Sequence, residues 1–547
     1  MRCLFLWSSS SWAHWCLQLG LFVTAARLDR TDVDCGTVMS QPNVDRALLN
    51  GNITSAMIDI RLANLLKTQF RLGFYNNVDT LPGWARFTPA KNVDTPAHRA
   101  LALEVAVQAA TLLKNSPGKG LPLDASGLGK IAVIGPMAAV TKELLGNYAG
   151  SPPYIVSPIK GIQSYSASYK VVFAPGCDIN SNATDPGNLT KAVQLAETAD
   201  AVVLVIGAGQ KFGGQEGSDR TGVGLPDPQN ELVREVAAAA SAADSLDGKL
   251  RPVVVVVISG ESLDLSELDS NPNVDAVLWM GYPGQSGGDA LASILFGKTN
   301  PSGRLPITFF KSAFVDEVRL GSKSACQVWF GGGSRQRRSV CASSLKPNFS
   351  NSQAWTIPLL SLWGWRVGGQ VPITDMAMRP NKTSGNPGRS YRFYTGTNVV
   401  YEFGRGLSYT TFSMSQQGDP EARILVDPVV ASLEQSTGVG IPLVSTTVAV
   451  KNTGSVAGAT SVLCFVKPPT PGVGGMPLKK LVDFAKVFLE PGQSKTVVCN
   501  VTSAHLSEPP GGVPGDERLS PTTTGLIPVA GRWTVMFGTV EMVVVVK

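Results

Sequence analysis

Short runs of consecutive apolar residues alternate with amphipathic stretches between residues 131 and 296. The runs are rich in Val and Ile and too short for helices, which is typical of strands buried on both faces. Strands that alternate with helices predict a mostly parallel α/β sandwich domain. The predicted strands are Ile131–Gly135, Lys170–Ala174, Ala201–Ile206, Val253–Ser259 and Ala276–Met280, and the predicted helices are Leu189–Thr198, Gln229–Ala243 and Asp289–Phe296.

Helical periodicity dominates the chain before this region. Asn43–Phe74 carries apolar residues near one helical face, and a second helix is predicted over His98–Asn115 because Pro96 and Pro117 bracket it. The apolar positions of the first helical stretch are Ile58, Leu62, Leu65 and Phe70.

The pattern changes again after about Val444, where short alternating runs are separated by Gly, Pro and Asn turns. This pattern predicts a small antiparallel β-sandwich. Cys464 and Cys499 lie in two of its strands and are either a disulfide or a pair of buried thiols, with equal weight. The predicted strands are Ser445–Lys451, Ser461–Val466, Ser494–Val501 and Trp533–Phe537.

Composition narrows the function classes. The 547 residues are 43% hydrophobic and 16% charged with a net charge of +6, and no basic run with interleaved aromatics indicates nucleic acid as a partner. Three histidines and eight scattered cysteines form no metal-ligand pairing, so we expect no catalytic metal and assign any acid–base chemistry to carboxylates.

The compartment is suggested by six N-x-[ST] sequons, which are compatible with a secreted glycoprotein. Ser8–Ser11 interrupt any clean signal-peptide core near the N-terminus, and no stretch reaches the ~18 apolar residues of a spanning helix. We therefore expect no membrane span and favour the secretory pathway, without a clear signal peptide. The sequon asparagines are Asn52, Asn182, Asn188, Asn348, Asn381 and Asn500.

The candidate chemistry lies in the glycine-rich stretch that follows Ala201–Ile206 and contains Glu216, Asp219 and Arg220. Ligands of open α/β sheets bind outside the carboxyl ends of the strands, so a carboxylate in this loop is a candidate for catalysis. A dinucleotide site is disfavoured because no G-x-G-x-x-G is present and prolines precede the next helix.

Several ordered motifs resemble glycoside hydrolase family 3, in particular its β-xylosidase-like branch. The strongest is WMGYPGQSGGDALASILFGKTNPSGRLPITF (Trp279–Phe309); IAVIGP precedes it, and YEFGRGLSYTTF and LVDFAKVFLEPGQSKTV follow it. TDVDCG and RLANLLKTQFRLGFY resemble the last turns of that family's catalytic (β/α)8 barrel. The resemblance covers most of the chain from about Ala25 onward and implies a fibronectin type III-like fold for the C-terminal sandwich.

The resemblance also implies a domain organisation. The expected parts are an unassigned N-terminus (1–27), a helical remnant of the barrel end with a linker (28–96), the α/β sandwich domain (97–318), an insert outside the family pattern and expected to be disordered (319–371), the end of the α/β domain with a linker (372–412), and the fibronectin type III-like β-sandwich (413–547).

Two regions depart from the family pattern. A barrel needs ~200 residues or more, whereas 130 residues precede Ile131, so most of the barrel and its nucleophilic aspartate are expected to be absent. Removal of Arg319–Val371 would join FVDEV to PITDMAMRP as continuous family sequence, which suggests a retained intron. The insert is also far longer than the ~12–15 residues beyond which structureless loops are uncommon.

By resemblance, the full enzyme would remove xylose or arabinose from the non-reducing ends of xylan-derived oligosaccharides by a retaining mechanism, and no cofactor is implied. Tyr148 and Trp279 could stack on a sugar ring, although core packing is favoured for Trp279. Glu216 matches the acid/base carboxylate of the family's E-G-x-D-R loop, although related loops carry another acid at the position of Gly214. Alternatively, Glu216 is structural, and pairing of Asp219 with Arg220 to hold the loop is the favoured role for those two residues. The alternative function is a non-catalytic carbohydrate-binding or scaffold protein, and xylosidase, arabinofuranosidase and glucosidase specificities stay open.

Overall fold

A computed structural model describes residues 41–77, 87–179, 185–209, 220, 222–319, 378–381, 385–425, 442–473, 475–508 and 527–547. The chain divides into two compact units, Met1–His98 and Arg99–Lys547, which are described separately. Within the described ranges, no helix has the length and apolar character needed to cross a membrane.

The first unit contains the predicted helical stretch as two helices, α2 (Gln41–Leu49) and α3 (Ser55–Arg71). Gly51 adopts a left-handed φ of 67° between them, and the Thr54 side chain caps α3 by accepting from the Met57 amide at 3.3 Å. None of the α3 residues is buried. A short helix, α4 (Pro89–Asn92), follows.

The helix predicted over His98–Asn115 ends earlier in the structure, and this prediction was wrong at its C-terminal end. Helix α5 (Pro96–Ala109) stops at Ala109, and β1 (Thr111–Asn115) pairs antiparallel with β6 (Ala276–Gly281). The TLLKN sequence continues the apolar pattern of the helix, but as a strand it buries both Leu112 and Leu113 completely at the sheet edge.

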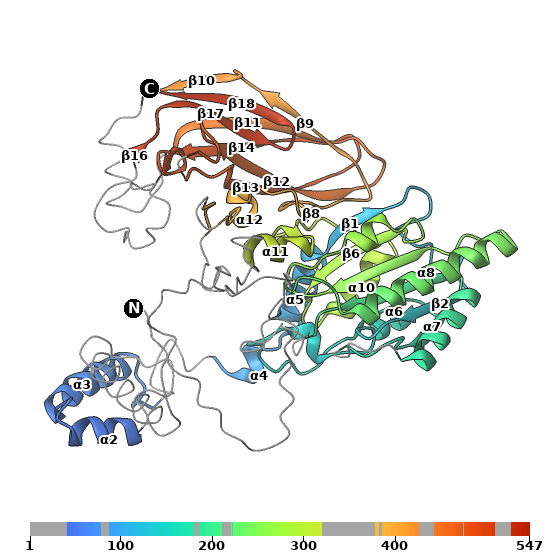
Figure 1. The fold of residues 1–547 in the computed structure, drawn as a ribbon, viewed down its shortest axis with the longest axis horizontal. Helices are drawn as coiled ribbons and strands as arrows, with labels where there is room; N and C mark the ends of the chain where they lie inside the picture. Colours follow the sequence, from blue (N-terminus) through green and yellow to red (C-terminus); the bar gives the residue numbers. More distant parts are fainter. Residues whose placement is uncertain are drawn as a thin grey trace, which may run out of the picture. The chain divides into compact units, whose positions relative to one another are not determined.

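The second unit contains a six-stranded sheet with the order β1-β6-β5-β4-β2-β3, parallel except at β1. Figure 1 labels β1, β6 and β2 of this sheet. Continuous Val and Ile runs make every residue of β4 and β5 buried, as two-sided burial requires. The remaining strands of the sheet are β2 (Lys130–Ile134), β3 (Lys170–Ala174), β4 (Ala201–Gly207) and β5 (Val253–Ile258).

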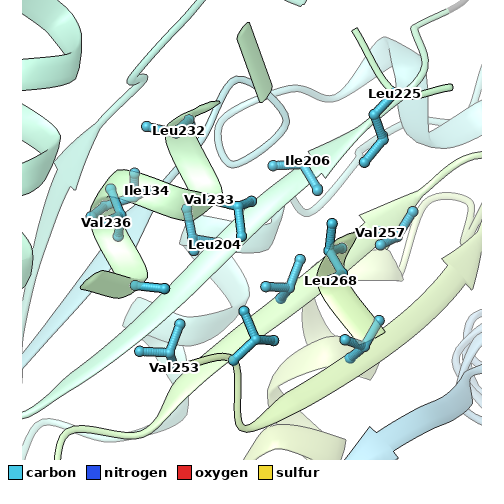
Figure 2. Packing of buried hydrophobic residues seen from close by; sticks show 14 of the residues in the cluster. Ile134, Leu204, Ile206, Leu225, Leu232, Val233, Val236, Val253, Val257 and Leu268 are labelled. Atoms are coloured by element: carbon cyan, nitrogen blue, oxygen red, sulfur yellow. The ribbon is translucent and has the colours of Figure 1, made fainter. Parts of the chain in front are cut away.

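Helices cover both faces of this sheet and create two cores. Figure 2 shows one of them, in which Leu204 of β4 lies close to Val233 and Val236 of α8 (Asp227–Asp247), and Val257 of β5 lies close to Leu268. This core also contains residues of α7 (Pro186–Thr198) and α9 (Ser266–Ser270). The opposite core joins the sheet to α5, α6 (Pro158–Tyr165) and α10 (Gly287–Leu295).

The C-terminal part forms the predicted sandwich, with one sheet ordered β10-β18-β17-β12-β13 and the other β14-β11-β9. Pairing is antiparallel except between β10 and β18, which are parallel. Cys464 and Cys499 form a disulfide between the two sheets, which decides between the two alternatives. The strands are β9 (Phe412–Gln417), β10 (Glu421–Ile424), β11 (Pro442–Asn452), β12 (Gly458–Lys467), β13 (Lys480–Leu489), β14 (Ser494–Thr502), β17 (Gly531–Phe537) and β18 (Val540–Val546).

Short elements connect these layers. The 372–412 region returns to the α/β domain where Phe309 of β7 pairs with Tyr401 of β8. The predicted insert, apart from Arg319, lies outside the described residues, and the predicted domain boundaries stay predictions. The short elements are η2 (Lys142–Leu145), β7 (Phe309–Phe310), α11 (Ala313–Arg319), α12 (Ser390–Phe393), β8 (Val399–Tyr401), η5 (Ala504–Leu506), β15 (Ser507–Glu508) and β16 (Ile527–Pro528).

The fold class predicted from the sequence is confirmed in its two main parts: a mostly parallel α/β domain is followed by a two-sheet β-sandwich.

Candidate functional site

The candidate site lies at the carboxyl edge of the parallel sheet. The strand order reverses between β2 and β4, because the chain proceeds to β3 on one side and to β5 and β6 on the other. Ligands of open α/β sheets bind at such an edge. The glycine-rich loop that follows β4 therefore leaves the sheet at a suitable place for chemistry.

Glu216 and Asp219 both lie outside the described residues, so their roles stay predictions. Arg220 is described and shows how the loop ends. Its Nε lies 3.0 Å from Glu261 Oε2, and its Nη2 donates to the Ser262 carbonyl at 3.1 Å. Whatever Asp219 contributes, Arg220 is held by the turn that follows β5.

Glu261 is a functional candidate that the sequence reasoning missed. Its side chain is 24% exposed, and burial raises the pKa of its carboxyl while the Arg220 charge acts in the opposite direction. The signal that could have indicated it is its position, directly after the apolar run of β5. A carboxylate there faces the same sheet edge as the loop after β4.

The start of the glycine-rich loop, at Gly207, is also fixed by hydrogen bonds. The Gln229 side chain, fully buried, accepts from the Gly207 amide and donates to the Gly207 carbonyl, both at 2.8 Å. Gly207 has a φ of 152°, and a Cβ there would lie 1.9 Å from the Ile258 carbonyl oxygen, so no other residue fits.

The chain that follows Arg220 is tied to the same turn as Arg220 itself. The Asp264 amide donates to the Val223 carbonyl at 2.7 Å, and Asp264 Oδ2 accepts from the Ser312 amide at 2.7 Å. Burial would raise the pKa of the Asp264 carboxyl, but the hydrogen bonds that it accepts from Ser266 and Ser312 outweigh burial and lower this pKa. The loop between Gly207 and Arg220 thus spans two anchored ends.

Tyr282, directly after β6, adds a third polar group to this edge. Its ring lies between two glycines, since a Cβ at Gly146 or Gly260 would lie 2.6 or 2.4 Å from ring atoms. Burial, and secondarily the negative charge of Glu261, raises the pKa of the Tyr282 hydroxyl. The edge therefore presents a guanidinium, a carboxylate and a phenol that are partly shielded from bulk water.

The predicted core role of Trp279 is confirmed, because its side chain is 6% exposed and its Nε1 donates to the Ser259 carbonyl at 2.8 Å. Tyr148 is exposed with a positive φ of 56°, and its stacking on a sugar stays a prediction. Across the described ranges, no three His, Cys, Asp or Glu side chains gather closely enough to hold a metal ion.

Two family descriptions match the sequence. Residues 110–409 match the glycosyl hydrolase family 3 C-terminal domain, and residues 460–508 match the fibronectin type III-like domain. The first match alone covers more than half of the chain's 547 residues.

Curated relatives and solved structures agree with these matches. Beta-D-xylosidase 1 of Arabidopsis thaliana is 34% identical over 492 residues, which cover 87% of this chain and 54% of the relative. Beta-xylosidase/alpha-L-arabinofuranosidase 1 of Medicago sativa subsp. varia is 32% identical over 487 residues, covering 86% of this chain and 52% of the relative. The chain thus spans about half the length of the curated relatives it matches.

A solved exo-beta-xylosidase in complex with a xylobiose aziridine probe superposes with a TM-score of 0.73 and 29% identity, covering 96% of this chain and 58% of that one. A beta-glucosidase from Listeria innocua superposes with a TM-score of 0.62 at 21% identity, covering 94% of this chain and 59% of that one, which shows likeness of fold.

Proposed function

The chain belongs to glycoside hydrolase family 3, and on that premise we propose that it supplies the acid/base half of a β-xylosidase-type site. The whole enzyme would hydrolyse terminal xylose or arabinose units from the non-reducing ends of xylan-derived oligosaccharides. The names of the relatives support this substrate class. The observation that carries the proposal is the glycine-rich loop held at Gly207 and Arg220 on the carboxyl edge of the sheet.

The proposed mechanism is the retaining one, in which one carboxyl group is the nucleophile and a second protonates the leaving group and then activates water. We assign the acid/base role to Glu216 and loop support to Asp219 and Arg220. Arg220 fits this supporting role because its guanidinium makes two contacts to the β5 turn.

We propose that the 547-residue chain by itself does not hydrolyse glycosides. The two carboxyl groups of a retaining site lie only ~5–5.5 Å apart, and the resemblance assigns the nucleophile to a barrel that this chain matches only at its end. A non-catalytic carbohydrate-binding or scaffold role is the second candidate function, and the cavity described below favours it.

The test is hydrolysis of an aryl β-xyloside by the purified chain. We expect no turnover above a heat-treated sample, and no change in Glu216→Gln. Clear turnover that Glu216→Gln abolishes, while the matched exposed change Glu197→Gln leaves it intact, would overturn the inactivity and support the role of Glu216. Turnover that survives Glu216→Gln would contradict the assignment of that residue.

We also propose that the protein is secreted and glycosylated. The Cys464–Cys499 disulfide supports an oxidising compartment, and the sequons are compatible with glycosylation. Mass spectrometry before and after treatment with an N-glycosidase checks this, and an unchanged mass in protein from a secreting host contradicts it.

A further inference from the structure

A cavity of about 1320 Å³ lies between the α/β domain and the sandwich, and the candidate site does not use it. One wall is a single face of α5, where lining residues recur at helical spacing, and a second is made by α6, α10 and the turn that follows α10. The third wall is the start of β12 and the outward face of β13. Small-molecule sites occur preferentially at such domain boundaries.

Direct contacts hold the walls in place. Asn300 Nδ2 donates to the Ala457 carbonyl at 3.2 Å, and Arg304 Nη2 donates to Thr460 Oγ1 at 2.9 Å. Lys486 Nζ on β13 donates to the Gln108 carbonyl of α5 at 3.4 Å, so these two walls are in direct contact. The cavity is therefore bounded by elements that are bonded to each other.

The charges of the lining balance. Among the described lining residues, the charged ones are two carboxylates, Glu104 and Asp289, and two ammonium groups, Lys298 and Lys486. Burial and the nearby Arg304 charge lower the pKa of Lys486, and burial raises the pKa of Asp289. A balanced set of donors and acceptors disfavours a strongly charged ligand and suits hydroxyl groups, which both donate and accept.

The apolar part of the lining also fits a sugar. Phe488 lines the cavity and is 61% exposed, and Tyr165 is held by stacking on Phe296 with ring centroids 4.5 Å apart. Exposed aromatic rings provide faces for the C–H groups of a pyranose. A protein-binding surface is less well matched, because the cores of protein interfaces are depleted in charged residues.

We propose that this cavity binds a neutral oligosaccharide, with Phe488 packing on a sugar ring and Glu104, Asp289 and Lys486 bonding its hydroxyls. The ligand class follows from the lining. The choice of xylan fragments rests on the proposed function. The site needs neither Glu216 nor a nucleophile, so it would hold polysaccharide chains whether or not the chain takes part in catalysis.

The experiment is isothermal titration of the full chain with xylohexaose, cellohexaose and the anionic oligosaccharide hexagalacturonate. We expect saturable binding of xylohexaose and at least tenfold weaker binding of hexagalacturonate. Phe488→Ala should weaken xylohexaose binding about tenfold, which corresponds to ~1.4 kcal/mol. Phe484→Ala is the matched control, since Phe484 lies on the same strand, is 70% exposed and is not among the lining residues.

The outcomes separate this proposal from the proposed function. The cavity proposal is supported if Phe488→Ala and Lys486→Met weaken xylohexaose binding and Glu216→Gln does not. This conclusion holds even when no hydrolysis of the aryl β-xyloside is detected. Equal binding of cellohexaose keeps the cavity proposal and removes its preference for xylan. Loss of binding in Glu216→Gln with no effect of Phe488→Ala overturns the proposal in favour of the sheet edge.

Two further results would also overturn the proposal. One is no heat signal and no NMR perturbation with millimolar xylohexaose. The other is self-association in light scattering that Phe488→Glu and Phe484→Glu abolish, without any sugar binding, because the face would then be a protein interface.

Discussion

The α/β sheet and the β-sandwich of the second unit bury their strands in different ways. Every residue of β5 in the α/β domain is buried, whereas β14 in the sandwich alternates buried and exposed positions along much of its length. The α/β sheet is covered by helices on both faces, and the sandwich relies on one buried face per sheet together with a disulfide between them. The difference predicts that polar substitutions are tolerated at every second position of a sandwich strand, but at no position of a strand that is buried on both faces.

The largest expected effect comes from polar substitutions at adjacent β5 positions. Val255 and Val256 belong to opposite cores, so Val255→Asn and Val256→Asn should each lower the free energy of unfolding by about 3–5 kcal/mol through lost burial and an unpaired amide. In β14, buried Val497→Asn should have a similar effect, whereas exposed Val498→Asn should cost under ~1 kcal/mol. Urea unfolding with hydrogen exchange measures this, and tolerance of Val256→Asn would contradict two-sided burial.

The next effect concerns the covalent link in the sandwich. Replacing Cys464 and Cys499 together by Ala opens a loop with a sequence separation of 35 and should cost the sandwich roughly 3–4 kcal/mol. The matched control is Cys177→Ala, since Cys177 is a buried free cysteine of the α/β domain. The thermal transition of the sandwich should fall in the double variant and in reductant. Equal sensitivity of both domains to reductant would contradict the comparison.

A smaller effect is expected at the carboxyl edge of the α/β sheet, where hydrogen bonds replace the covalent link. Gln229→Leu removes both bonds to Gly207 and should destabilise the domain by about 2 kcal/mol. Hydrogen exchange at the Gly207 amide should accelerate, whereas exposed Gln194→Ala on α7 should not affect it. An unchanged exchange rate would mean that Gln229 does not anchor the loop.

The smallest effect is a change in the pH dependence of stability. Because the folded-state pKa of Glu261 is raised above its usual value of 4.5, ionisation of Glu261 reduces stability as pH rises from about 4.5 through the raised pKa. Glu261→Gln should therefore flatten the fall in unfolding free energy over this range. Unfolding at several pH values measures the slope, and an identical slope in both proteins would show that Glu261 is not desolvated.

The pattern of residues predicted the interior of the α/β domain well because its signals are local. The Val253–Ile258 run is too short for a helix and consists of β-branched residues only, which favours a strand buried on both faces. The end of α5 could not be predicted in this way, since TLLKN suits a helix as well as a strand. The free edge of β6 decided it by pairing with β1.

The candidate site shows the same division. The glycine-rich loop and its carboxylates were evident from composition, but the partners of its ends were not. Arg220 and Ser262 are 42 residues apart, and nothing local links Gln229 to Gly207.

The sequence by itself determined the buried strands of the α/β sheet, the family and the loop that carries Glu216, because apolar runs, turn residues and ordered motifs depend on neighbouring residues. The tertiary structure decided the Arg220–Glu261 pair, the disulfide and the cavity beside Phe488, because each of these needs segments that only chain folding brings together.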